Sequence, residues 1–303
     1  MRRIPSDRLP HLAVDRLQST ARSTSPLDDG DFTDWLTPAR PAGTLDVQRL
    51  AEQAEHVLAD LGIQPDVGPQ FLQHVPPRLA KIRAQVCQLA RVQGAARQQV
   101  SLAGLSMQCQ WLASYARMAN FYAVSQVAST LEGLTKGLYD APGRLNEATL
   151  RSVAQGVDLI SALATTSPNK TGRAEGARVL VADDEASSRL QTLSVLEQHG
   201  VAGIGMGTID GTLSLLNENT VDVIVLQAAA NATTTAQLCQ AIRRLPRQGL
   251  TPLLVLSAAH QWESRAVLAM SGASEVVPRN LLEPELALKV LGYFFRARLE
   301  ALS

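Results

Sequence analysis

The sequence predicts an all-α helical bundle followed by an α/β region built on a doubly wound, five-stranded parallel sheet. Two observations predict this order. From Leu45 to about Ala164, apolar residues recur at helical spacing and no strand pattern interrupts them. After residue 177, five short aliphatic runs alternate with five helical segments, as in parallel strands joined by crossover helices. Hydrophobic residues make up 46% of the 303 residues, enough for a sizeable core.

Composition divides the chain into four parts. Residues 1–45 are rich in Pro, Ser, Thr, Asp and Arg and are predicted to be a mostly disordered tail. Residues 46–164 form the predicted bundle, and residues 165–177 read as a linker. Residues 178–303 are the predicted α/β region, which ends in a long helix.

One short island stands out in the tail. Phe32, Trp35 and Leu36 would lie on one side of a single helical turn, among four acidic residues. Two interpretations are open: an accidental turn, or a docking peptide that folds on a partner or on this protein's own body. Short motifs arise often by chance, which favours the first interpretation.

Five helices are expected in the bundle and five strands in the α/β region. The expected helices of the bundle are 45–62, 71–94, 100–119, 121–138 and 148–164. The expected strands are 177–183, 201–206, 221–227, 251–257 and 274–277. The helices expected between and after them are 186–199, 213–219, 234–245, 261–270 and 283–302.

Charge and cysteine content narrow the classes of function. The formal net charge is +0, with 28 basic and 28 acidic residues, which gives no electrostatic case for binding nucleic acid or an anionic membrane. The three cysteines lack metal-ligand spacing and are expected to be free thiols in a reducing compartment. No apolar run is long enough to insert into a membrane, and the first residues lack the apolar core of a signal peptide. We therefore expect a cytoplasmic protein.

Four stretches of the α/β region carry a family resemblance. They are Asp183-Asp184 after the first strand, VDVIVL, TPLLVLSA, and Gly272-Ala273 before the fifth strand. With them, residues 177–300 resemble a response-regulator receiver domain of the CheY-like kind. The resemblance implies an acidic pair that helps to hold Mg²⁺ beside a third aspartate, which ends the third strand and accepts a phosphoryl group. It also implies a phosphate-binding Ser or Thr after the fourth strand and a Lys after the fifth.

Several of the family's residues are replaced. Ser257 fits the hydroxyl position, but Gln227 stands at the acceptor position and Arg279 at the Lys position. Val276 stands where the family has an aromatic switch residue. An amide oxygen cannot form an acyl phosphate, so Gln227 cannot accept the phosphoryl group.

The replacements predict a degenerate receiver pocket without a catalytic residue, metal or cofactor. Loss of one carboxylate weakens a Mg²⁺ site, because this ion needs hard anionic oxygens. A guanidinium can hold a carboxylate through two hydrogen bonds, so we expect Arg279 to reach Asp183 or Asp184. The predicted pocket consists of Asp183, Asp184, Gln227, Ser257 and Arg279.

The bundle is similar in outline to a histidine-phosphotransfer bundle. FLQHVPPRLAKI resembles the opening helix of that family, and Leu131-Glu132 matches a later conserved pair. At the family's spacing from that pair, Gln110 occupies the histidine position, Ala113 the lysine position and Ser114 the glycine position. The resemblance therefore implies a bundle that has lost its phosphoryl carrier, with His56 as a minority alternative carrier.

The last helix has two apolar stripes. Leu286, Val290, Tyr293, Phe294 and Ala297 suit a helix that covers a sheet. The second stripe consists of Leu288, Leu291, Phe295 and Leu299. It either forms a homodimer surface or packs on this protein's own bundle, and periodicity does not distinguish the two.

The leading hypothesis is a two-component-type signalling adaptor or regulatory module. It would act by contact with other signalling proteins and independently of phosphorylation, and it would not be an enzyme. One alternative is the N-terminal regulatory part of a diguanylate cyclase or kinase whose output domain is not in this chain. Another is a small-molecule sensor that uses the vacated receiver pocket.

Overall fold

The computed structural model describes residues 67–92, 94–166, 174–228, 232–258 and 262–302. The expected helix 45–62 and the possible docking peptide of Phe32, Trp35 and Leu36 lie outside the described residues. All that follows concerns the described residues.

Within the part of the chain that the structure describes, four long helices precede the sheet. They are α2 (Gly68–Leu89), α3 (Ala95–Met118), α4 (Tyr122–Asp140) and α5 (Glu147–Ala164). In α2 the buried residues recur every three or four positions, which gives the single apolar face that a bundle helix needs. The short η2 (Pro142–Arg144) connects α4 to α5, and the Asn146 side chain caps α5 by accepting a hydrogen bond from the Thr149 amide at 3.0 Å. None of the described helices is long and apolar enough to cross a membrane.

The sheet has five parallel strands in the order β2-β1-β3-β4-β5. They are β1 (Val179–Ala182), β2 (Gly203–Met206), β3 (Val223–Gln227), β4 (Leu253–Ser257) and β5 (Glu275–Pro278). This is the doubly wound order of the flavodoxin and receiver folds, with the topological switch between β1 and β3. The structure therefore confirms the predicted α/β fold class and places the ligand-binding edge of such a sheet at the carboxyl ends of β1, β3 and β4.

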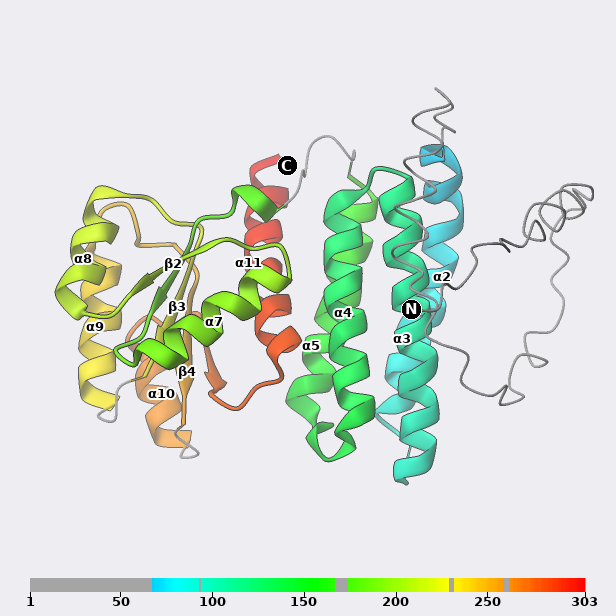
Figure 1. Ribbon diagram of the computed structural model, residues 1–303, viewed down its shortest axis with the longest axis horizontal. Helices are drawn as coiled ribbons and strands as arrows, with labels where there is room; N and C mark the ends of the chain where they lie inside the picture. The colour runs from blue at the N-terminus through cyan, green and yellow to red at the C-terminus, as the bar shows by residue number, and fades with distance from the viewer. Residues whose placement is uncertain (1–66, 93, 167–173, 229–231, 259–261, 303) are drawn as a thin grey trace, which may run out of the picture. The chain divides into compact units, whose positions relative to one another are not determined.

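Alternate residues of each strand face opposite layers of helices. On one face, Val181 and Val225 share a core with α7 (Ala186–Gln198) and α11 (Glu283–Leu302). On the other face, Leu180 and Ile224 share a core with three further helices (Figure 1). These helices are α8 (Ile209–Glu218), α9 (Ala232–Arg244) and α10 (Trp262–Met270). The near-continuous aliphatic strands are thus explained by burial on both sides.

One side chain fixes the loops on either side of β4. The guanidinium of Arg243 donates to the carbonyls of Gly272 at 2.7 Å, Gln248 at 3.1 Å and Thr251 at 2.6 Å, and to Ser274 Oγ at 3.2 Å. Gly272 has a φ of 104°, and a Cβ there would come within 2.6 Å of Arg243 Cγ. Glycine is needed at this position both for its backbone conformation and for the approach of the arginine.

The final helix belongs to two layers at once. One side of α11 packs on the sheet, and its other side packs on α4 and α5. A Cβ added to Gly156 of α5 would lie 3.2 Å from Cδ2 of Leu288 and 3.3 Å from Leu131 of α4. The Leu288 side chain of α11 therefore packs closely against both bundle helices. The apolar residues of the bundle and of this face of the sheet consequently form one continuous core.

This packing corrects the expected dimer surface. Leu288, Leu291 and Phe295 are buried within the chain, and Leu299 is partly buried against the same core. The second stripe of the last helix therefore packs on this protein's own bundle, and it is not available for a homodimer. The boundaries 46–164, 165–177 and 178–303 stay a prediction, although the parts they separate share a core.

Candidate functional site

The sheet brings four of the predicted pocket residues to its carboxyl edge. Asp183 and Asp184 follow β1, Gln227 is the last residue of β3, and Ser257 is the last residue of β4. Arg279 follows β5 directly, and its amide donates to the Ser257 carbonyl at 2.9 Å. The topology alone accounts for this gathering, because the carboxyl ends of parallel strands lie on one edge.

Asp183 is largely committed to local structure. Its side chain is buried, and Oδ1 accepts a hydrogen bond from the Glu185 amide at 3.0 Å. Its own amide donates to the Met206 carbonyl at 3.0 Å, and its carbonyl accepts from Arg189 Nη1 at 2.6 Å. Asp183 therefore shapes the turn that leads from β1 into α7, a structural task for a carboxylate in this position.

Arg279 binds a different acid from the expected one. Its Nη2 donates to Glu185 Oε2 at 2.9 Å and to Ser188 Oγ at 3.2 Å. The expectation that Arg279 would reach Asp183 or Asp184 is wrong in this structure, because Glu185, the residue before α7, pairs with Arg279 instead. Both partners of the ion pair are largely solvent-exposed, so it contributes little to stability.

The surroundings of Glu185 favour its ionised form. Hydrogen bonds from the Ser187 hydroxyl and from Arg279, together with the Arg279 charge, lower the pKa of Glu185 below its ordinary value. The ionised Glu185 carboxylate is thus already stabilised by a hydroxyl group, from Ser187, and by the guanidinium of Arg279.

Sequence reasoning missed Glu185 and Arg189, the two residues that complete this arrangement. Arg189 lies across the edge strand, where a Cβ on Gly205 would come within 3.0 Å of its Cδ and a Cβ on Gly207 within 2.9 Å of its Nη1. The alternating glycines of GIGMG could have indicated the position of Arg189. A strand whose residues on one face are all glycine leaves room there for a long side chain from a neighbouring helix.

Mg²⁺, which the receiver resemblance implies, does not fit these residues well. Gln227 supplies a neutral amide in place of a third carboxylate, one Asp183 oxygen is already hydrogen-bonded to an amide, and Glu185 is held by Arg279. Across the described ranges, no group of three or more His, Cys, Asp or Glu side chains is placed to hold a metal ion. Mg²⁺ prefers several hard anionic oxygens, so this donor set is a poor one.

Gln227 lines pockets on both sides of the sheet edge. One pocket, of about 200 Å³, extends over Asp183, Asp184 and Met206. The other, of about 250 Å³, extends over Glu185 and Arg279. The sheet edge thus has room for small groups next to the amide, and on the side of the second pocket the charges of Glu185 and Arg279 already match each other.

The remaining predicted positions lie apart from this edge. Val276 is buried in β5, and its carbonyl accepts from Arg265 Nη2 at 3.0 Å. Gln110, Ala113 and Ser114 lie on α3, where Gln110 is exposed and the other two are partly buried. The structure places the three on one helix and brings no described histidine into the carrier position.

Comparison with known proteins gives matches among solved structures alone. No protein-family profile matches the sequence, and no curated protein matches it. Three of the structural matches are as follows. The Francisella response regulator 1452 receiver domain is 25% identical, with 40% of this chain and 98% of that chain covered and a TM-score of 0.37. Chemotaxis response regulator CheY4 of Vibrio cholerae is 24% identical, with 38% and 95% covered and a TM-score of 0.35. A two-component response regulator from Clostridium difficile is 18% identical, with 42% and 98% covered and a TM-score of 0.36. These scores carry no argument about function, and it is the strand order β2-β1-β3-β4-β5 that gives the C-terminal part of the chain a receiver-like α/β fold.

Proposed function

We propose that this protein is a signalling adaptor of the two-component type that works by contact with other signalling proteins and without phosphorylation. One observation carries the proposal: the acceptor position at the end of β3 holds Gln227, an amide that cannot form an acyl phosphate. The bundle is proposed to be a degenerate phosphotransfer module, with Gln110 at the carrier position. The protein is further proposed to be cytoplasmic and to have no enzymatic activity.

The charges beside Gln227 support the same proposal. In a phosphorylated receiver, a cation after the fifth strand would pair with the new phosphoryl group. In this chain the corresponding guanidinium, Arg279, pairs with Glu185 and Ser188. With Arg279 already paired to an acid of the same chain and no acceptor carboxylate at Gln227, signalling would depend on contact surfaces.

The shared core suggests how such a contact could be transmitted. Helix α11 contributes residues to the sheet side and to the bundle side of one core. Packed cores respond to displacement as units, because they are close-packed and not continuously deformable. A partner that shifts α4 or α5 would therefore also bias the sheet through α11.

The test is phosphorylation of the full-length chain. Wild type and Gln227→Asp would be incubated with acetyl phosphate and Mg²⁺, and intact mass would be measured by mass spectrometry. We expect no adduct on wild type. Gln227→Asp is the matched variant, since it restores the carboxylate without changing the size of the side chain greatly. A Mg²⁺-dependent adduct on the wild-type protein, with a change in its assembly, would refute phosphorylation-independent action.

A small-molecule sensor is a second candidate function, favoured by the two pockets that flank Gln227. In this case ligand binding at the sheet edge would replace phosphorylation as the input. A thermal-shift screen of wild type and Gln227→Leu separates this function from the first, because only a ligand in these pockets would lose affinity in the variant.

A further inference from the structure

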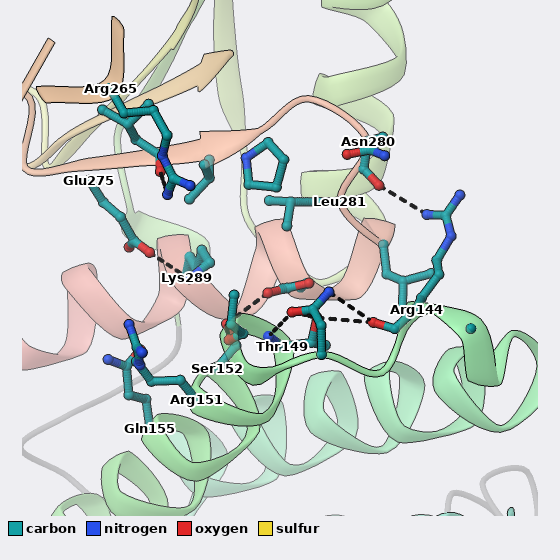
Figure 2. A pocket seen from close by; sticks show the side chains of 18 residues that line it. Arg144, Thr149, Arg151, Ser152, Gln155, Arg265, Glu275, Asn280, Leu281 and Lys289 are labelled. Atoms are coloured by element: carbon teal, nitrogen blue, oxygen red, sulfur yellow. Dashed lines mark hydrogen bonds and ion pairs between the residues drawn. The ribbon is translucent and has the colours of Figure 1, made fainter. Parts of the chain in front are cut away.

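A separate pocket lies where the bundle meets the sheet. It has a volume of about 280 Å³, near the lower end of the range for small-molecule sites. Its walls come from the start of α5 and the turn before it, from β5 and the residues after it, and from α11 (Figure 2). This pocket shares no lining residue with the pocket over Asp183 and Asp184.

Cations outnumber anions around it. Four cationic side chains line the pocket, against two carboxylates, so its formal charge is positive. The cations are Arg144, Arg151, Arg265 and Lys289, and the carboxylates are Glu275 and Glu285. Figure 2 shows Arg265, Lys289 and Arg151 toward one end and Arg144 at the other.

Two of these cations are matched by carboxylates and two are not. Lys289 Nζ lies 2.7 Å from Glu275 Oε1, and Arg151 pairs with Glu147 at 2.8 Å. Arg144 donates to the Asn280 carbonyl at 3.0 Å and Arg265 to the Val276 carbonyl at 3.0 Å. Within the described residues neither Arg144 nor Arg265 forms an ion pair, so one unmatched guanidinium remains at each end.

The floor between the two ends can accommodate an anion. Glu285 is 2% exposed, and the Ser152 hydroxyl donates to its Oε1 at 2.8 Å across the junction. Burial raises the pKa of Glu285, against the lowering by the Ser152 hydrogen bond and the Lys289 charge, and the nearby Glu275 raises it further. The hydrogen bond from Ser152 offsets part of the negative charge of this buried carboxylate. Apolar surface from Val277 and Leu281 completes the lining.

We propose that this junction pocket binds a small organic dianion, with one carboxylate or phosphate group at Arg144 and another at Arg265. A guanidinium suits either group, because its planar donors match two oxygens at once. The spacing of the unmatched cations at opposite ends selects a ligand charged at both ends over a monoanion. The inference does not rest on the proposed function, since Gln227 does not line this pocket, although Leu281 and Leu282 also line the pocket over Glu185 and Arg279.

Binding there would connect the two parts of the chain. The ligand would contact Arg144, in the turn before α5, on the bundle side. On the sheet side it would contact Arg265 of α10, whose guanidinium donates to the Val276 carbonyl. Val276 occupies the position of the receiver switch residue. A bound dianion would therefore hold α5, β5 and α11 in one arrangement, which is an input that needs no phosphoryl transfer.

The test is isothermal titration of the full-length chain with succinate, a dianion, with 3-phosphoglycerate, whose carboxylate and phosphate together carry close to three negative charges, and with butyrate as the monoanion. We expect at least one of the two ligands that are charged at both ends to bind, and butyrate to bind much more weakly. The tighter of the two identifies the source as a dicarboxylate or a phosphorylated acid. Arg144→Gln and Arg265→Gln should each weaken binding about ten- to hundredfold, the loss typical of one charged hydrogen-bonded contact.

Two further variants keep the result decisive. Arg247→Gln is the matched control, because Arg247 is exposed and donates to the Glu218 carbonyl away from the pocket; its binding should equal wild type. Among the described residues the Gln155 side chain forms no hydrogen bond, so Gln155→Glu only adds a negative charge at the pocket rim and should also weaken binding. It decides the outcome if an arginine variant fails to fold. Absence of binding by either ligand charged at both ends at millimolar concentration, or affinity unchanged in Gln155→Glu, would overturn the proposal.

Discussion

Replacing Leu288 by alanine tests whether the bundle and the sheet are one cooperative structure. Leu288 of α11 is 3% exposed, and its side chain lies against Gly156 of α5, next to Leu131 of α4. A buried Leu→Ala substitution costs about 2–5 kcal/mol, the lost transfer energy together with the cavity left behind. A domain of 5–15 kcal/mol total stability would lose a large share of it. For a chain of this size the melting temperature should fall by about 2–4 °C for each kcal/mol.

Hydrogen exchange followed by mass spectrometry locates the loss. If the core is shared, amides of α4 and α5 and amides of β1 and β3 should lose protection together and by similar free energies. Leu190→Ala is the matched control, because Leu190 on α7 is 65% exposed, and its effect should stay within about 0.5 kcal/mol. Loss of protection in the sheet while the bundle keeps its own would show two independent domains and refute the reasoning.

Three further predictions concern buried polar groups and thiols. Arg243→Ala should lower stability by at least about 2 kcal/mol in urea unfolding, because three carbonyls and one hydroxyl lose a charged donor. Glu285→Gln should stabilise the fold more at pH 7 than at pH 4: a raised carboxyl pKa favours the folded state at low pH, and that contribution is lost as the pH rises through the folded pKa. Of the three thiols, Cys87 alone should react with a thiol reagent at pH 8 in the folded state, because burial raises the pKa of Cys109 to about 12 and of Cys239 to about 11.

The first two of these have a control in the same chain. Arg244→Ala changes an exposed neighbour and should leave the urea midpoint nearly unchanged. Glu147→Gln is the control for Glu285→Gln, because it changes an exposed carboxylate of α5 in the same way. A destabilisation by Glu285→Gln that grows with pH would contradict the role of burial, and modification of two or three thiols in the folded protein would contradict the buried state of the cysteines.

The sequence was informative wherever a structural rule is local. Aliphatic runs such as VIVLQ ended where Gln227 ends β3, and the helical spacing of α2 and α4 matched their buried faces. The start of α8 was missed by four residues, because the cap is a single hydroxyl: Thr208 Oγ1 accepts from the Gly211 amide at 3.1 Å. The periodicity of apolar residues carries no information about a capping hydrogen bond of this kind.

The site was less predictable because it depends on pairing between distant residues. The resemblance identified which side chains lie at the sheet edge, but it did not indicate that Arg279 would pair with Glu185 and not with an aspartate. The junction pocket depends on Ser152 meeting Glu285 across 133 positions of the chain. The sequence of α11 does not show which surface each apolar stripe covers. Only the tertiary structure distinguishes packing within the chain from dimerisation.

The double-sided α11 has a practical consequence for anyone dividing this polypeptide. A cut between residues 167 and 173 would leave Leu288 and Leu291 uncovered on one fragment, and the facing surface of α4 and α5 uncovered on the other. Each half produced separately should precipitate, or bind detergents and chaperones. When both fragments are produced in the same cell, they should associate into a non-covalent heterodimer. An affinity tag on either fragment should then purify both.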